Sequence, residues 1–242
     1  MKGILFSLLL CSAGATAQMV FEEQDGLLVI ELESAAPLPN NWVLGPAENP
    51  TSPNISDPGD ATGQGFIVWE DRQYLNAPGN GEIVFFVMIN NPGTYRFEWR
   101  NQVGRGTNTT EHNDTWLKID ADSYFGQRGS SVVCPKGRNP SENDCVGGQP
   151  EGSGSDGWFK VYSSGANDWR FSTRTSDNDA HDIFARFDSA GVYTIRLSAR
   201  SSSHVIDRLI MHSDTFSGNP RSLDLPESVQ IDLDTVFSDG FE

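Results

Sequence analysis

Asn90-Asn-Pro-Gly-Thr-Tyr-Arg-Phe-Glu-Trp-Arg100 is the stretch that decides the fold. Its first four residues have the Asn, Pro and Gly chemistry of a tight reversal. The rest alternates strictly, with aromatic side chains on one face and polar side chains on the other. Asp188–Ser198 repeats the same plan. A reversal followed by such a strand is typical of an antiparallel sheet with one face in a core.

Eight stretches of the 242-residue chain carry strand signals, each short and bounded by turn residues. They are Gly65–Glu70, Glu82–Ile89, Thr94–Arg100, Thr115–Asp120, Trp158–Tyr162, Asp182–Phe187, Val192–Arg200 and Val205–His212. No window of useful length has the apolar period of an amphipathic helix. The sequence therefore predicts an all-β sandwich of two antiparallel sheets.

Two regions break the strand pattern, residues 37–63 and 126–157, and both are rich in turn-forming residues. We expect long loops there, and long loops on a rigid sandwich carry function or are disordered. After Ser213 the chain becomes polar and acidic. The sequence thus predicts one sandwich domain over residues 18–213 and a mobile, acidic C-terminal tail over residues 214–242.

The first seventeen residues have the pattern of a signal peptide, with Lys2 as the basic end, Ile4–Leu10 as the apolar run and Ala15-Thr-Ala17 as the cleavage site. We therefore expect a secreted protein, extracellular or, in a bacterium, periplasmic or on the cell surface. No later apolar run approaches the roughly 20 residues of a membrane span. The 17 basic and 33 acidic residues give a formal charge of −16, which argues against nucleic acid as a partner. We expect a monomer.

Cys134 and Cys145 remain once the signal peptide is removed, and a Gly- and Asn-rich insert separates them. An even number of cysteines in an exported protein predicts a disulfide. On the chain-entropy estimate, a loop of this size gains about 3 kcal/mol. A metal-binding cysteine pair is the alternative, but the mature chain has no further cysteines to complete such a site.

Carboxylates interrupt two apolar stretches at opposite ends of the domain, Leu27–Glu33 and His204–Met211. In a strand, Glu31 and Glu33 share a face of the first stretch. The residues expected to share a face of the second are Val205, Asp207, Leu209 and Met211. If these faces meet, three carboxylates converge beside apolar side chains and require a cation or a proton. Calcium is the expected cation, and the alternative is that the carboxylates point to water at sheet edges.

Three motifs together resemble the carbohydrate-binding modules of the family 6, family 35 and malectin-like group. They are Val29–Ser34, Gly93–Arg100 and Ser198–Ile210, and the resemblance that they carry covers roughly Val20 to His212. The resemblance implies a β-jelly roll with a structural calcium held by first-strand carboxylates and a last-strand aspartate, here Glu31, Glu33 and Asp207. It also implies sugar binding on loops at one edge, with an aromatic platform. An asparagine often precedes the last strand in these modules, whereas Ser203 and His204 stand here.

The run Thr110-Glu-His-Asn-Asp-Thr-Trp116 is the most distinctive candidate for ligand binding. Alternation places Asp114 and Trp116 on the outer face of the next strand, where a flat ring among charges suits a sugar. His112 and Asn113 would supply further polar contacts. The alternative is that a loop covers Trp116 and that His112–Asp114 forms an Asx-type turn.

Further candidates for ligand binding are Trp158 and Trp169, which lie in or beside the second long loop region, and Arg200 and His204 near the final turn. Exposed tryptophans favour ligand contact, although packing against the cysteine loop is the alternative. Arg200 and Arg208 could clamp a sugar carboxylate. The alternative is that the two arginines pair with nearby acidic side chains. For His204, the alternative is an exposed side chain without a role in binding.

These features favour a secreted, non-catalytic polysaccharide-binding protein with a structural calcium. The sequence has no nucleophile elbow, no zinc-protease motif and no phosphate-binding loop. A carboxylate acid–base pair near His112 can be imagined, but spacing does not test its geometry. Two alternatives stay open: a polysaccharide lyase or glycoside hydrolase on the same scaffold, and a cell-surface or matrix domain that binds proteins.

Overall fold

The chain folds into an all-β sandwich, as the alternation predicts. The computed structural model describes residues 19–35, 37–39, 41–45, 60–137, 149–151, 156–163, 167–175 and 179–232. Within them the helical content is one short 3₁₀ segment, Leu32–Ala35. No helix in these ranges is long and apolar enough to cross a membrane. The expected signal peptide, residues 1–17, lies outside the described residues.

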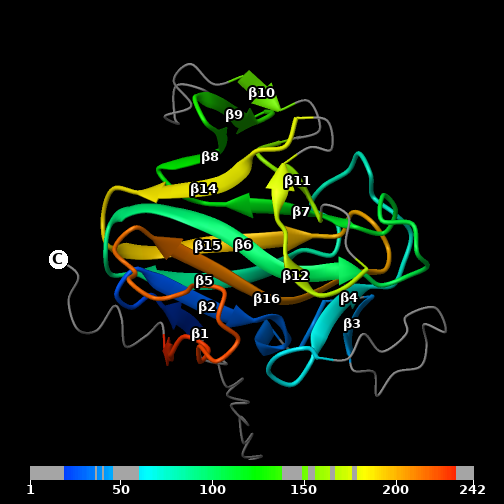
Figure 1. The fold of residues 1–242 in the computed structure, drawn as a ribbon, viewed down its shortest axis with the longest axis horizontal. Coiled ribbons are helices and arrows are strands. Elements are labelled where there is room, and N and C mark those ends of the chain that lie inside the picture. The colour runs from blue at the N-terminus through cyan, green and yellow to red at the C-terminus, as the bar shows by residue number, and fades with distance from the viewer. Residues whose placement is uncertain are drawn as a thin grey trace, which may run out of the picture.

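Within the described ranges, one sheet has seven strands and the other has ten. The first has the order β13 (Arg174–Thr175), β11 (Phe159–Tyr162), β7 (Asp114–Ile119), β15 (Gly191–Ser198), β5 (Ile83–Ile89), β1 (Met19–Glu22) and β17 (Gln230–Asp232). The path of the second is β10 (Gln149–Glu151), β9 (Ser131–Pro135), β8 (Ser123–Arg128), β14 (Asp182–Phe187), β6 (Gly93–Val103), β16 (His204–Ser213), β4 (Phe66–Trp69) and β3 (Trp42–Gly45). Off this path, β12 (Arg170–Phe171) pairs with β6, and β2 (Leu27–Glu31) pairs with β16. Figure 1 shows β14, β6 and β16 side by side.

Among the strands that the structure describes, pairing is antiparallel apart from two short parallel pairs, β1 with β5 and β10 with β9. Aromatic side chains from both sheets fill the space between the layers. Tyr124 of β8 meets Phe159 of β11 with ring centroids 4.9 Å apart, and Phe187 of β14 meets Tyr193 of β15 at 4.5 Å. Trp99, predicted to face the core, is fully buried there. The largest cluster of buried residues in the described part of the chain has members from both sheets and so joins the two layers.

A β-bulge makes the faces of the last strand differ from the predicted ones. The register of β16 against β6 shifts between Ile206 and Arg208, so the alternation changes at Asp207. Ile206, Leu209 and Met211 therefore enter the central core, whereas Val205 packs in a separate cluster. The prediction that Val205 shares a face with Leu209 and Met211 is wrong, because an extra residue in one strand moves its neighbours to the other face.

The first predicted strand is also shorter than expected. Strand β2 ends at Glu31, and the chain then turns into the 3₁₀ segment that carries Glu33. The two glutamates therefore do not project from one flat strand face as predicted. Both are nevertheless buried, because the turn at Leu32 carries Glu33 back towards the sheet.

Several strands lie in regions expected to be loops. Strand β3 forms within the first region, and β9 with part of β8 within the second. These strands are only four to six residues long, too short for alternation to give a clear signal.

The segment after Ser213, expected to be a mobile tail, lies on the sandwich as far as Asp232. Strand β17 pairs with β1 at the edge of the seven-stranded sheet. The Ser228 amide donates to the Val29 carbonyl at 2.9 Å, and the Arg221 Nε donates to the buried Glu98 at 2.9 Å. The acidic segment is thus part of the folded unit up to β17, and residues 233–242 lie outside the described residues.

Candidate functional site

The structure brings together six of the eight residues predicted to bind ligand, at the end of the sandwich where β7 begins and the β15–β16 turn lies. They are His112, Asn113, Asp114, Trp116, Arg200 and His204. Asp114 connects the two segments, because its buried carboxylate accepts hydrogen bonds from Arg200 and from the Ser201 hydroxyl. The Lys160 ammonium lies 3.6 Å from the same carboxylate. A buried carboxylate held in this way orders the rim of the site.

Trp116 is covered rather than presented on an open face. It is 1 % exposed, its Nε1 donates to the Tyr74 carbonyl at 2.9 Å, and the Arg200 guanidinium lies over its ring at 5.0 Å. The covering segment is the loop from Arg72 to Asn80, between β4 and β5. Of the two alternatives for Trp116, the structure has the covered one.

His204 is also buried, with 0 % exposure. Its Nδ1 lies 2.8 Å from the Thr115 hydroxyl and its Nε2 lies 2.9 Å from Asn101 Oδ1. The Asn101 amide nitrogen donates to carbonyl groups, so its oxygen accepts from Nε2–H and the hydroxyl donates to Nδ1. Burial lowers the pKa of His204 to about 4, although Asp114 opposes this. His204, on β16, therefore links β7 through Thr115 and β6 through Asn101, and it does not project from the loop.

His112 and Asn113 order the entry to β7. His112 has a left-handed backbone, with φ of 53°, and its Nδ1 contacts the Ser202 carbonyl at 2.7 Å. Asn113 is buried and donates to the carbonyls of Thr109 and Ser163 at 3.1 and 3.2 Å. Their polar groups are thus engaged by the backbone, as the turn alternative predicts.

The two other tryptophans do not share an open surface with Trp116. Trp158 is buried. Trp169 is half-buried, with its ring 5.8 Å from that of Phe66 and 5.0 Å from the Arg100 guanidinium. A continuous platform of tryptophans is therefore absent from this set of three.

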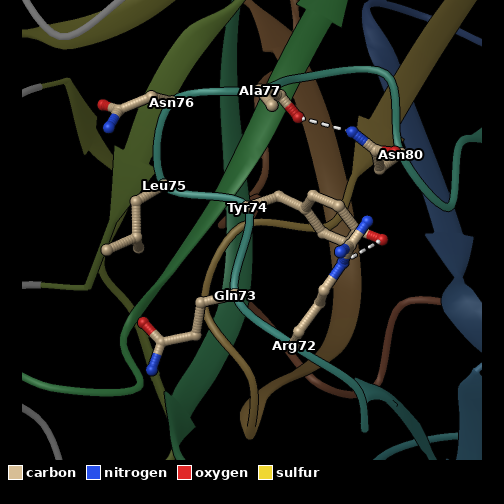
Figure 2. Close-up of a pocket in the computed structure, with 7 residues that line it drawn as sticks. All are labelled: Arg72, Gln73, Tyr74, Leu75, Asn76, Ala77 and Asn80. Atoms are coloured by element: carbon tan, nitrogen blue, oxygen red, sulfur yellow. Dashed lines mark hydrogen bonds between the residues drawn. The ribbon is translucent and has the colours of Figure 1, made fainter.

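An open hollow of about 810 Å³, which the sequence did not predict, lies on the loop that covers Trp116. Its lining residues are Arg72, Gln73, Tyr74, Leu75, Asn76, Ala77 and Asn80. Figure 2 shows Gln73, Leu75 and Asn76 projecting from one side of the loop, and Tyr74 beside Arg72 on the other. The Arg72 Nε donates to the Tyr74 hydroxyl at 3.0 Å. The sequence signal for this hollow was the eleven-residue stretch 71–81 between two predicted strands, which contains a tyrosine, amide side chains and Pro-Gly.

Hydrogen bonds fix the loop that carries the hollow to Arg200 and to the end of β15. The Tyr74 amide donates to the Arg200 carbonyl at 2.8 Å, and the Gly79 amide donates to the Ser198 hydroxyl at 2.7 Å. The Tyr74 ring packs on Trp69 at 6.0 Å. Two of the predicted residues, Trp116 and Arg200, therefore support this loop.

The three predicted metal ligands surround a second feature, the turn from Asp60 to Gln64. The Thr62 hydroxyl lies 2.8 Å from Glu31 Oε2 and 3.0 Å from Asp207 Oδ2, and the Thr62 amide donates to Asp207 Oδ1 at 2.9 Å. Glu33 Oε1 accepts from the Gln64 amide. Two arginines that the sequence analysis did not place here balance part of the charge: Arg100 pairs with Asp207, and Arg208 pairs with Glu31. Arg208 therefore lies in this cluster and does not form a clamp with Arg200.

The chemistry of this oxygen-rich cluster is compatible with a hard cation. Thr62 has one hydroxyl proton, so it can satisfy only one of its two carboxylate neighbours at a time. Glu33 Oε2 is buried without a hydrogen-bond partner. Burial raises the pKa of Glu33 to about 7, and the charges of Glu31 and Asp207 add to this. In the described part of the chain, no group of three or more His, Cys, Asp or Glu side chains stands ready to hold a metal ion.

Cys134 lies in β9, whereas Cys145 lies outside the described residues. The disulfide therefore stays a prediction.

Comparisons with known proteins assign no family. No family model matches the chain, and no curated protein matches it. Among solved structures, the chain is similar to the crystal structure of a Podospora anserina GH26-CBM35 β-(1,4)-mannanase, with 12% sequence identity and a TM-score of 0.42. The match covers 82% of this chain and 29% of the mannanase chain.

Proposed function

We propose that this protein is an exported carbohydrate-binding protein that binds a polysaccharide in the hollow on the Arg72–Asn80 loop, without chemical change at that site. The observation that carries the proposal is the mixed lining of this hollow. Leu75 is 43 % exposed, and the aromatic ring of Tyr74 stands beside the Arg72 guanidinium. The amide side chains of Gln73 and Asn76 project on the same side of the loop as Leu75, as Figure 2 shows.

This lining is complementary to a sugar. Pyranose rings present apolar C–H groups to aliphatic or aromatic side chains, while their hydroxyls need donors and acceptors. An amide supplies both a donor and an acceptor, and a guanidinium supplies donors only. The volume of about 810 Å³ is within the roughly 300–1,000 Å³ of small-ligand sites. A chain with a formal charge of −16 repels anionic polymers at long range, which favours a neutral polysaccharide.

A fixed loop also favours binding, because ordering a free loop costs conformational entropy when the ligand arrives. Trp116 and the backbone of Arg200 already hold the Tyr74 segment through hydrogen bonds of 2.9 and 2.8 Å. The predicted residues thus support the proposed site indirectly, as positioning residues.

We propose further that calcium is a structural partner at Glu31, Glu33 and Asp207, with the Thr62 hydroxyl as an added oxygen ligand. Calcium prefers carboxylate, hydroxyl and carbonyl oxygens. The unpartnered Glu33 oxygen and the single Thr62 proton support this, because a cation would satisfy the oxygens that they leave unpaired. Its effect would be on stability, by joining β2, the following 3₁₀ turn and β16.

A glycan array, followed by calorimetry on any ligand found, tests the carbohydrate proposal. Leu75→Ala and Asn76→Ala should each weaken binding about tenfold or more, as expected when about 1.4 kcal/mol of contact is lost. Leu223→Ala is the matched control, because Leu223 is 47 % exposed and does not line the hollow. Absence of binding to any polysaccharide, or an equal loss in all three variants, contradicts the proposal.

A further inference from the structure

Ser131 and His181 form a hydrogen-bonded pair in the ten-stranded sheet, at the β8–β9 hairpin. Ser131 opens β9 and is exposed, whereas His181 precedes β14 and is completely buried. The hairpin lies beside β14, near the top of the view in Figure 1. An exposed hydroxyl with a buried imidazole behind it is the arrangement that a serine nucleophile requires.

The hydrogen bonds define the tautomer of His181. Its Nδ1 lies 2.7 Å from the backbone carbonyl of Asp179. A carbonyl oxygen can only accept, so Nδ1 carries the proton and Nε2 has the free lone pair. Ser131 Oγ lies 2.9 Å from Nε2 and therefore donates to it. This is the tautomer that allows Nε2 to act as a general base towards the serine.

The carboxylate of Asp179 and the guanidinium of Arg128 lie beside the Ser131–His181 pair. The Asp179 carboxylate oxygen Oδ2 lies 3.9 Å from His181 Nδ1, where it can stabilise an imidazolium. Arg128 Nη2 contacts the other oxygen of Asp179 at 2.6 Å, and Arg128 is opposite Ser131 in the hairpin register. Arg128 is exposed, so its charge is screened by solvent.

The imidazole is held in place by packing. The His181 amide donates to the Thr175 hydroxyl at 3.2 Å, and the Thr175 amide donates to the His181 carbonyl at 3.1 Å. At Gly126 an added Cβ would lie 3.0 Å from His181 Cβ and 2.8 Å from Val133 Cγ2. The glycine therefore leaves the room that the histidine occupies.

A second hydroxyl–histidine pair in this protein shows what a structural role looks like. Thr115 and His204 are linked at 2.8 Å, but both are buried, so no substrate can reach that hydroxyl. Ser131 differs in its exposure. Near it, at Gly129, an added Cβ would meet nothing within 4 Å, so there is open space at the turn beside the serine.

We propose that Ser131 is a nucleophile activated by His181, and that it cleaves carboxylic esters of an alcohol. Ser131 Oγ attacks the carbonyl carbon while its proton passes to His181 Nε2. The bond from that carbon to the leaving oxygen then breaks, and the leaving alcohol takes the proton from Nε2. Water repeats the two steps in the second half, which releases the carboxylic acid and restores the serine. This activity is independent of the proposed carbohydrate site.

A fluorophosphonate probe and p-nitrophenyl acetate test the proposal on the full-length protein. The probe should label Ser131 with loss of fluoride, and peptide mapping should locate the label there. Ser131→Ala should abolish labelling and acetate release. His181→Asn should slow both at least a hundredfold, because general-base catalysis typically contributes roughly 100- to 10,000-fold. The matched control is Ser130→Ala, which removes the adjacent exposed hydroxyl of the same turn and should leave both rates unchanged.

Absence of labelling in the wild-type protein overturns the proposal, as does a label that maps to Ser130. Unchanged labelling in a folded His181→Asn variant also overturns it. If that variant does not fold, the position of the label in the wild-type protein is the test, because Ser130 and Ser131 differ in their access to His181 Nε2. A label on Ser131 then supports the proposal, and a label on Ser130 contradicts it. The Ser131→Ala variant removes an exposed hydroxyl and should retain the wild-type circular dichroism spectrum.

Discussion

Replacing Glu98 by glutamine tests how the C-terminal segment joins the fold. Glu98 is a buried carboxylate on β6, and Arg221 from the C-terminal segment donates to both of its oxygens. Burial opposes its ionisation, but the hydrogen bonds from His212 and Arg221 and the charge of Arg96 outweigh burial and lower the pKa of Glu98 to about 2. The amide of Glu98→Gln keeps the shape and removes the charge.

The size of this effect on the free energy of unfolding follows from the pKa of Glu98, which is about 4.5 in the unfolded chain and about 2 in the folded protein. Each unit is worth 1.36 kcal/mol, so the ionised carboxylate contributes about 3 kcal/mol to the free energy of unfolding at neutral pH. Because the folded pKa is the lower one, this contribution is fully present above pH 4.5 and is lost as the pH falls through 2. Between pH 7 and pH 3 it should shrink by about 2 kcal/mol.

Urea unfolding at pH 7 and pH 3 measures this. The free energy of unfolding of the wild-type protein should exceed that of Glu98→Gln by about 3 kcal/mol at pH 7 and by about 1 kcal/mol at pH 3. Asp188→Asn is the control, because Asp188 is an exposed partner of Arg186 and its pair contributes little. A difference between wild type and Glu98→Gln that does not change with pH would refute the assignment of the charge to a native ion pair.

Two other predictions concern the carboxylate cluster around Thr62. In urea titrations, Gly63→Ala should lower the free energy of unfolding by about 1–3 kcal/mol more than the control Gly79→Ala. Both glycines have positive φ. Of the two, Gly63 is the one at which an added Cβ would clash, because it would lie 2.0 Å from Glu33 Oε1. A difference near zero would show that Glu33 moves aside freely. Chelation of calcium should lower the melting temperature of the wild-type protein by several degrees, because binding only to the folded state stabilises it, and Asp207→Asn should lose this response; a chelator without effect on the wild type argues against a bound ion.

Alternation of apolar and polar residues was enough to predict the framework of the sandwich. All eight predicted strands are present, because residues such as Phe97 and Leu197 pack in the core and fix which face is inside. The short strands β3 and β9 were missed, since four or five residues give little periodic signal and their pairing depends on neighbours distant in the sequence.

The carboxylate cluster was predictable in part. Residue types and spacing indicated that Glu31 and Asp207 lie together, and Thr62 does contact both. The bulge at Asp207 and the neighbouring Arg100 were not predictable, because a bulge has no sequence period and strand order brings Arg100 from β6.

By itself the sequence determined the sandwich and the inward face of each regular strand, because these follow from local alternation and turn chemistry. The tertiary structure decided which six of the eight candidate ligand-binding residues gather at one rim, because strand order brings distant segments together. Only the tertiary structure decided which of these residues are accessible. Burial depends on what a distant segment covers: the Tyr74 loop closes over Trp116 and carries the open hollow itself, and β14 brings His181 behind the exposed Ser131.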